Sequence, residues 1–281
     1  MNDDKHIEFL TTKTNPEVKI RLMTIKAKNS KYSNRNFFLI MGWLSEINLF
    51  EPLAEQLAEF GNVFIYEPRG YGKSITPHKK GLFSIEEYNK EISTVLQLKG
   101  LKDKEFIIFG SCSGGAMAFC YYLDGKGPKP FAMAIISPQP HYKTPFWLPI
   151  FGHLPNFLMN FIQKLIIIFM NIYLKFKDPE EVKNVIHAKT QLTKNDAWCL
   201  RRFVHEFIIP YDIRDRIADI DIPMVMFVGK KDHFLNLEQS KQFLLNPKSK
   251  LIELEETAHR IQEGNEKKMA EETNIFLENL L

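Results

Sequence analysis

The chain has 281 residues, of which 44% are hydrophobic and 25% charged, as is ordinary for a globular protein. Its formal net charge of +3 is small for this length and indicates no nucleic-acid partner. No signal peptide is expected from the first residues, and three widely spaced cysteines without zinc-ligand spacing favour a reducing cytoplasm and no bound metal.

The first half of the chain alternates short apolar runs with amphipathic segments. Strands are predicted at 6–10, 18–27, 36–41, 62–66, 106–109 and 131–136, and helices at 49–60, 84–98 and 115–123. This alternation predicts a parallel sheet wrapped by helices. A glycine-rich loop from Glu67 to Ser74 has neither a Walker pattern nor Gly-x-Gly-x-x-Gly, so no nucleotide cofactor is expected.

Residues 104–118 contain the motif around which the site is predicted. The apolar run 106–109 is followed at once by Gly110-Ser111-Cys112-Ser113-Gly114 and then by a small-residue helical segment. Strand, sharp turn and helix are the context of a nucleophile elbow, whose central residue here is Cys112. A motif centred on Ser111 would have a large residue where the turn needs a small one, and a motif centred on Ser113 is sterically less favourable. The alternative is a glycine-rich turn that carries a buried, inert cysteine.

The alternation breaks between Ser137 and Tyr211, where no strand is predicted. This stretch contains an apolar helix at 156–176, but polar residues interrupt that helix and argue against a membrane span. We expect a helical cap at 138–211 inserted into a core of 1–137 and 212–281, with peripheral membrane contact through the cap as the weaker expectation. The residues predicted to line an apolar pocket are Phe146, Trp147, Ile150, Phe151, Phe157 and Phe161.

Two polar residues follow the last predicted strands. Asp232 comes just after the strand at 222–229, and His259 just after the strand at 250–254, with a terminal helix at 262–281. The carboxyl ends of parallel strands share one edge of a sheet, so Cys112, Asp232 and His259 are expected to meet there in the chain order nucleophile, acid, histidine. Taken singly, Asp232 could be a turn residue and His259 a surface loop residue.

Together these motifs resemble the α/β-hydrolase fold, from about Ile20 to the C-terminus. The run Phe38 to Trp43 is similar to the family's strand before the oxyanion hole, with Met41 in place of histidine. Glu67 to Ser74 resembles its Asp-x-Arg-Gly-x-Gly-x-Ser loop, with Glu67 for the aspartate, and Gly229 to Asp232 and Ala258-His259 resemble its acid and histidine loops. In having cysteine at the elbow, the chain resembles dienelactone hydrolases and polyhydroxyalkanoate synthases.

The resemblance implies a mostly parallel sheet flanked by helices, with an inserted helical cap. It also implies an oxyanion hole formed by the backbone N–H groups of Trp43 and Ser113. The expected function is hydrolysis of a hydrophobic ester or thioester, a small-molecule acyl substrate, by Cys112, His259 and Asp232 through an acyl-cysteine intermediate. An acyltransferase or lactone-forming enzyme with the same triad, or a non-catalytic binding protein, are the alternatives. Substrate identity and oligomeric state stay open at this point.

Overall fold

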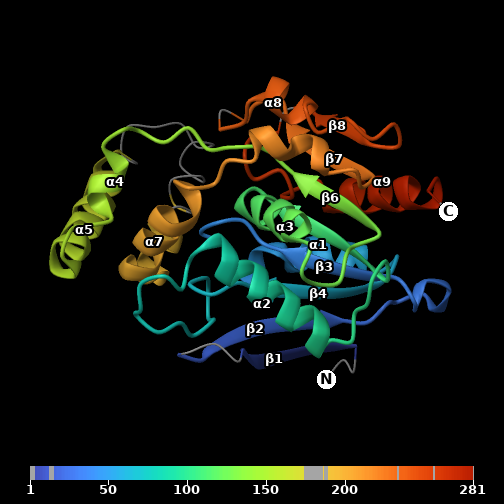
Figure 1. The fold of residues 1–281 in the computed structure, drawn as a ribbon, viewed down its shortest axis with the longest axis horizontal. Helices are drawn as coiled ribbons and strands as arrows, with labels where there is room; N and C mark the ends of the chain where they lie inside the picture. The colour runs from blue at the N-terminus through green and yellow to red at the C-terminus, as the bar shows by residue number, and fades with distance from the viewer. Residues whose placement is uncertain are drawn as a thin grey trace.

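The computed structural model describes residues 4–12, 16–173, 186, 189–232, 234–255 and 257–280. Its centre is an eight-stranded sheet in the order β1-β2-β4-β3-β5-β6-β7-β8 (Figure 1). The strands are β1 Lys5–Thr12, β2 Val18–Ile25, β3 Asn36–Ile40, β4 Asn62–Glu67, β5 Phe106–Ser111, β6 Ala132–Ile136, β7 Met224–Gly229 and β8 Lys250–Leu254. Strand β2 pairs antiparallel with β1 and β4, and the pairs from β4 to β8 are parallel. The predicted α/β-hydrolase fold is confirmed.

Helices cover both faces of this sheet. They are α1 Ile47–Leu57, α2 Ile85–Leu98, α3 Ser113–Asp124 and α9 Glu266–Glu278. Successive strand side chains point to opposite faces, so Phe106 and Ile108 of β5 pack with α2 and α3, whereas Ile107 and Phe109 pack with α1 and α9. This two-sided burial explains why the strands read as unbroken apolar runs. Ser84, the N-cap of α2, accepts a hydrogen bond from the Glu87 backbone N–H at 3.3 Å.

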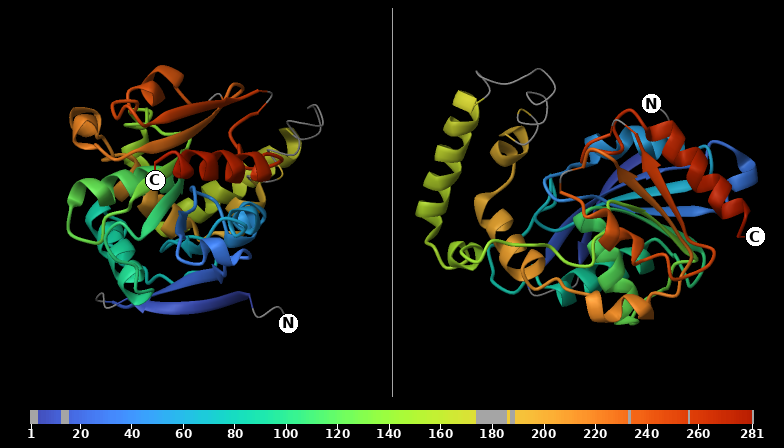
Figure 2. Two further views of the ribbon diagram at one scale, coloured as in Figure 1. Left: turned by 90° about the vertical axis from the view of Figure 1, so that its right-hand side faces the viewer. Right: turned by 90° about the horizontal axis from the view of Figure 1, so that it is seen from above.

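The described elements between β6 and β7 are helical. They are α4 Leu148–Phe151, α5 Asn156–Tyr173, α7 Ala197–Phe203, the π-helix η3 Val204–Ile208 and the 3-10 helix η4 Arg214–Asp219. Glu206 in η3 accepts from the backbone N–H groups of Gly81 and Phe83, each at 2.8 Å, and so ties this segment to the loop before α2. Helix α5 stands at the edge of the molecule, beside α7 and away from the sheet (Figure 2).

Helix α5 was expected to continue to Phe176, which lies outside the described residues. Within the described ranges, no helix combines the length and the hydropathy needed to cross a bilayer. The remaining short elements are the 3-10 helix η1 Ser30–Tyr32 and helix α8 Leu237–Lys241.

The glycine-rich loop after β4 connects neighbouring helices through buried polar contacts. The buried Glu67 carboxylate accepts from the backbone N–H groups of Ile47, at 3.0 Å, and Lys73, at 2.7 Å. Burial raises the pKa of Glu67 despite these two donors. Arg69, also fully buried, donates from Nε to Glu91 Oε2 at 2.6 Å. The loop thus joins the start of α1 to α2 through buried polar contacts, which cost free energy to break because each would leave an unpaired group.

Candidate active site

Cys112 occupies the sharp turn between β5 and α3. Its φ of 48° and ψ of −113° are strained for a residue with a side chain, whereas Ser111 is the last residue of β5 and Ser113 the first of α3. Neighbouring glycines let the backbone approach closely: a Cβ on Gly110 would lie 2.7 Å from the Gly115 Cα, and one on Gly114 only 2.2 Å from the Ile40 carbonyl oxygen. The turn presents the thiol, which is partly exposed, at the carboxyl edge of the sheet.

The loops after β7 and β8 bring the acid and the histidine together. His259 Nδ1 lies 2.9 and 3.1 Å from the two carboxylate oxygens of Asp232. Backbone bonding joins the loops, since Lys231 N–H donates to the Thr257 carbonyl at 3.0 Å. A Cβ on Gly229 would lie 2.4 Å from that same carbonyl oxygen, so only glycine permits the approach.

Cys112 lies close enough to His259 to act on the ionisation of its ring. Burial alone lowers the pKa of His259, but the hydrogen bond to Asp232 and the nearby Cys112 side chain outweigh it and raise the pKa to about 10. Burial by itself would raise the pKa of Asp232, yet the bond to His259 and the imidazolium charge bring it below its usual range. The structure therefore pairs His259 with Asp232, puts Cys112 near His259, and favours a charged His259.

Two further groups hold Asp232, and sequence reasoning missed both. Ser137 Oγ donates to Asp232 Oδ2 at 3.0 Å, and the Phe234 backbone N–H donates to Oδ1 at 2.9 Å. Ser137, directly after β6, has a positive φ of 49°, and its N–H bonds to the Phe227 carbonyl at 2.9 Å. The position of Ser137 in the sequence could have indicated this role. It follows a strand that neighbours β7, so its side chain lies at the same carboxyl edge of the sheet as Asp232.

Aromatic side chains surround the elbow. Tyr142 lies near Cys112, and the Tyr71 hydroxyl lies 3.2 Å from Ser113 Oγ. Burial raises the pKa of both tyrosines well above its usual value. Phe203 of α7 packs against Tyr71 with ring centroids 5.5 Å apart and against Trp43 at 5.9 Å. These rings come from separate loops and a helix, so no local sequence pattern could have grouped them.

The two residues expected to supply the oxyanion hole both lie beside the elbow. Ser113 begins α3, and Trp43 follows Gly42 in the loop after β3. A Cβ on Gly42 would lie 3.5 Å from the Cys112 Cβ, so the chain passes directly against the nucleophile candidate just before Trp43. Met41, which stands where the family resemblance has histidine, is fully buried.

The residues expected to line the pocket are placed differently. Phe146 is 93% exposed and Phe157 is 75% exposed, and Trp147, Ile150 and Phe161 are also exposed. They belong to the surface of α4, α5 and the loop before α4, so in this structure they do not enclose a pocket. The apolar pattern in the sequence predicts a helix with an apolar face, but it does not determine whether that face points into a pocket or toward solvent. The side chain of Phe151 lies outside the described part.

One group of side chains outside this site has metal-ligand chemistry. His78, Asp196 and Cys199 offer ligand atoms within 4.8 Å of one another. Asp196 already serves both partners, because its Oδ1 accepts from the Cys199 N–H at 2.9 Å and lies 3.2 Å from His78 Nε2. Burial raises the pKa of Cys199 to about 12 and keeps it a thiol. The group fastens α7 to the loop before α2.

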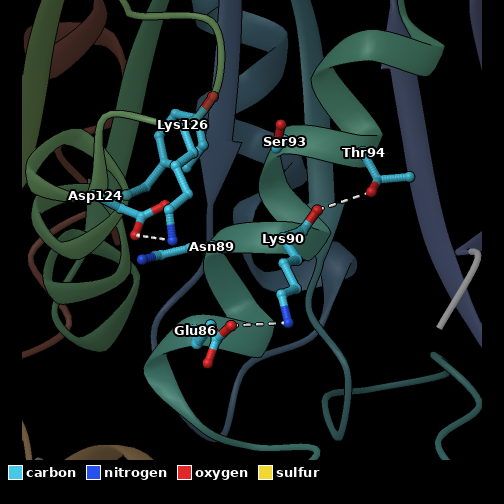
Figure 3. A pocket seen from close by; sticks show the side chains of 8 residues that line it. Glu86, Asn89, Lys90, Ser93, Thr94, Asp124 and Lys126 are labelled. Atoms are coloured by element: carbon cyan, nitrogen blue, oxygen red, sulfur yellow. Dashed lines mark hydrogen bonds and ion pairs between the residues drawn. The ribbon is translucent and has the colours of Figure 1, made fainter. Parts of the chain in front are cut away.

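A polar hollow of about 230 Å³ lies between α2 and the end of α3 (Figure 3). Its charges are paired within it, with Lys90 Nζ 2.9 Å from Glu86 and Lys126 Nζ 3.5 Å from Asp124. The residues that line it include no thiol and no histidine, and its Glu86 and Asp124 carboxylates are paired with lysines. The elbow is the stronger candidate for an active site.

The fold and this site define an α/β-hydrolase. The family described as serine aminopeptidase, S33, matches residues 33–266, and the chain belongs to that family. Its description names serine, whereas the elbow of this chain carries Cys112. A search of curated protein sequences found no match.

Solved structures share the fold over nearly the whole chain. An esterase from Exiguobacterium antarcticum is 17% identical, with a TM-score of 0.72 and coverage of 96% of this chain and 100% of the other. A thermophilic esterase from Thermogutta terrifontis is 12% identical, with a TM-score of 0.75 and 98% of each chain covered. A bromoperoxidase from Bacillus anthracis is 17% identical, with a TM-score of 0.73 over 96% of this chain and all of that one. At these identities the likeness establishes the fold alone.

Proposed function

We propose that this α/β-hydrolase cleaves a hydrophobic carboxylic ester or thioester through an acyl-Cys112 intermediate. The observation that carries the proposal is the contact chain from Asp232 through His259 to Cys112, at an elbow with φ of 48°. A nucleophile, a base within hydrogen-bond reach and a group that orients the base are the parts that covalent acyl transfer requires.

The roles follow from which atoms face each other. His259 Nδ1 is engaged by Asp232, so Nε2 is the ring nitrogen left for Cys112. His259 is the base that takes the thiol proton, so that the sulfur attacks as thiolate. Sulfur bonds to the carbonyl carbon, the π electrons move to oxygen, and the N–H groups of Trp43 and Ser113 would stabilise the oxyanion. The start of α3 adds a favourable dipole.

Collapse of the tetrahedral intermediate releases the leaving group, which takes the proton from His259. The neutral His259 then accepts a proton from water as the water oxygen attacks the thioester carbon. Breakage of the carbon–sulfur bond restores the thiolate and the charged imidazole. The rings of Tyr71, Tyr142, Trp43 and Phe203 around the elbow support an apolar acyl group, since aromatic surface gains free energy when apolar groups cover it.

The test is to trap the acyl-enzyme with p-nitrophenyl butyrate and measure intact mass. We expect one butyryl group on the native chain and none on Cys112→Ala, with kcat/KM about 10⁴-fold lower in that variant. Ser113→Ala is the matched control. It should keep activity within about tenfold, because the proposed role of Ser113 uses its backbone N–H. An active Cys112→Ala would overturn the assignment.

The same experiment separates hydrolysis from transfer. An acyl-cysteine is a thioester, which amines and thiols attack readily, so the trapped adduct is chased with water alone and then with an alcohol, an amine or a thiol. Discharge in water supports the hydrolase. An adduct that persists in water and is discharged only by an acceptor identifies an acyltransferase, and failure to form any adduct favours a non-catalytic binding protein.

A further inference from the structure

The outer surface of the cap carries an apolar face that the proposed chemistry does not use. We define the cap face as Phe146, Ile150, Phe157, Phe161, Leu165, Ile168 and Ile172, all large hydrophobic residues that are exposed. The five on α5 recur at intervals of four, four, three and four residues, which places them on one side of the helix. Exposed large hydrophobics gathered on neighbouring elements mark a candidate interaction surface.

Helix α5 has three distinct sides. Its inner side faces α7 and the segment just before α7, where Gln163 Nε2 donates to the carbonyls of Leu192 and Asn195. The exposed polar residues Asn160, Lys164 and Asn171 form an edge next to the apolar stripe. An apolar stripe with polar residues along one edge is compatible with a helix that lies in the plane of a membrane interface. At 18 residues α5 is about 27 Å long and could lie flat along such a surface.

The charges near the cap face select the kind of partner. Residues 138–173 contain no aspartate or glutamate, although the whole chain has 34 of them. The same stretch carries Lys143 and Lys164, both exposed. Two copies of this face brought together would oppose lysines with no carboxylate in the stretch to pair them. An anionic lipid surface instead matches both the apolar stripe and the positive charges.

We propose that the cap face docks on an anionic lipid surface, with the α5 stripe inserted among the head groups and Lys143 and Lys164 against lipid phosphates. The protein would rest on the membrane surface through α4 and α5, which Figure 2 shows at the end of the molecule away from the sheet. This docking concerns the location of the protein and does not depend on the chemistry of Cys112.

The test is co-sedimentation with vesicles of phosphatidylglycerol and phosphatidylcholine, compared with phosphatidylcholine alone. The native chain should partition more strongly onto the anionic vesicles. Phe157→Ser with Phe161→Ser should lower that partitioning at least tenfold. Lys164→Gln should lower it about fivefold on anionic vesicles and leave it unchanged on neutral ones.

Matched controls distinguish this face from general stickiness. Ile275 on α9 and Leu98 on α2 are exposed hydrophobics on other surfaces, so Ile275→Ser and Leu98→Ser should bind vesicles as the native chain does. Far-ultraviolet circular dichroism checks that every variant is folded. The proposal is wrong if the native chain binds neither vesicle, or if the control variants lose binding equally. It is also wrong if light scattering shows a dimer that the Phe157 and Phe161 changes dissociate while vesicle binding is absent, since a second copy would then cover the face.

Discussion

His259 is the residue whose ionisation links the site to the stability of the protein. Its contacts with Asp232 and Cys112 raise its pKa from the ordinary 6.5 to about 10. Between those two values the folded protein binds a proton that the unfolded chain does not. The stabilisation from this group is therefore complete below pH 6.5 and disappears as the pH rises through about 10.

This linkage predicts a pH-dependent difference between the native chain and His259→Gln. The free energy of unfolding, measured in urea from pH 6 to pH 10, should favour the native chain most at the acidic end, and the difference should shrink toward pH 10. In Cys112→Ala the decline should be complete at a lower pH and smaller in total, because one of the two contacts that raise the pKa of His259 is gone. A difference that does not change with pH would contradict the charged His259.

At the scale of elements, the elbow depends on how closely α3 and β3 approach each other. Gly114, in the first turn of α3, lies against the end of β3, where a Cβ would come within 2.2 Å of the Ile40 carbonyl oxygen and 2.5 Å of that of Met41. Backbone atoms cannot move aside as a flexible side chain can. The glycine therefore sets the distance between the nucleophile turn and the loop that leads to Trp43.

We expect Gly114→Ala to lower the free energy of unfolding by at least about 3 kcal/mol, through overpacking against this backbone. The control is Gly100→Ala, where a Cβ meets nothing within 4 Å and only the positive φ of 69° is unfavourable. That change should cost about 1–2 kcal/mol. Urea denaturation measures the free energy of unfolding of both variants. Equal losses in Gly114→Ala and Gly100→Ala would show that the close approach of the backbone is not the reason for glycine at 114.

At the scale of the whole molecule, the cap contributes to two surfaces. Through α7 it packs Phe203 against Tyr71 and Trp43 beside the elbow, and through α4 and α5 it exposes an apolar face to the outside. The proposed acyl site is thus walled by α7 and the neighbouring loops, and not by the residues first expected from the aromatic density of the cap.

This wall predicts a preference among soluble esters. Each methylene that the wall covers should raise kcat/KM about fourfold, from about 0.8 kcal/mol of transfer free energy. A series of p-nitrophenyl esters from acetate to octanoate measures the profile. Each ester is kept below its micelle concentration so that the cap face does not contribute. A flat or falling profile would indicate a small or polar acyl group.

The sequence by itself determined the sheet, because strands buried on both faces read as apolar runs and the motifs after them sit at strand ends. It also indicated which groups would meet, since the positions of Cys112, Asp232 and His259 follow from the ends of β5, β7 and β8. These are local patterns combined with one topological rule, and the rule places strand ends without any knowledge of packing.

Only the tertiary structure decided which way the cap faces and what surrounds the elbow. The apolar periodicity of α5 is the same whether the helix covers a pocket or faces outward, and the direction depends on how α5 packs against α7. Ser137, Tyr71 and Tyr142 reach the site from separate segments, and their roles depend on side-chain contacts between residues far apart in the chain. Such contacts leave no local signal, because a serine or a tyrosine reads the same in sequence wherever its hydroxyl finds a partner.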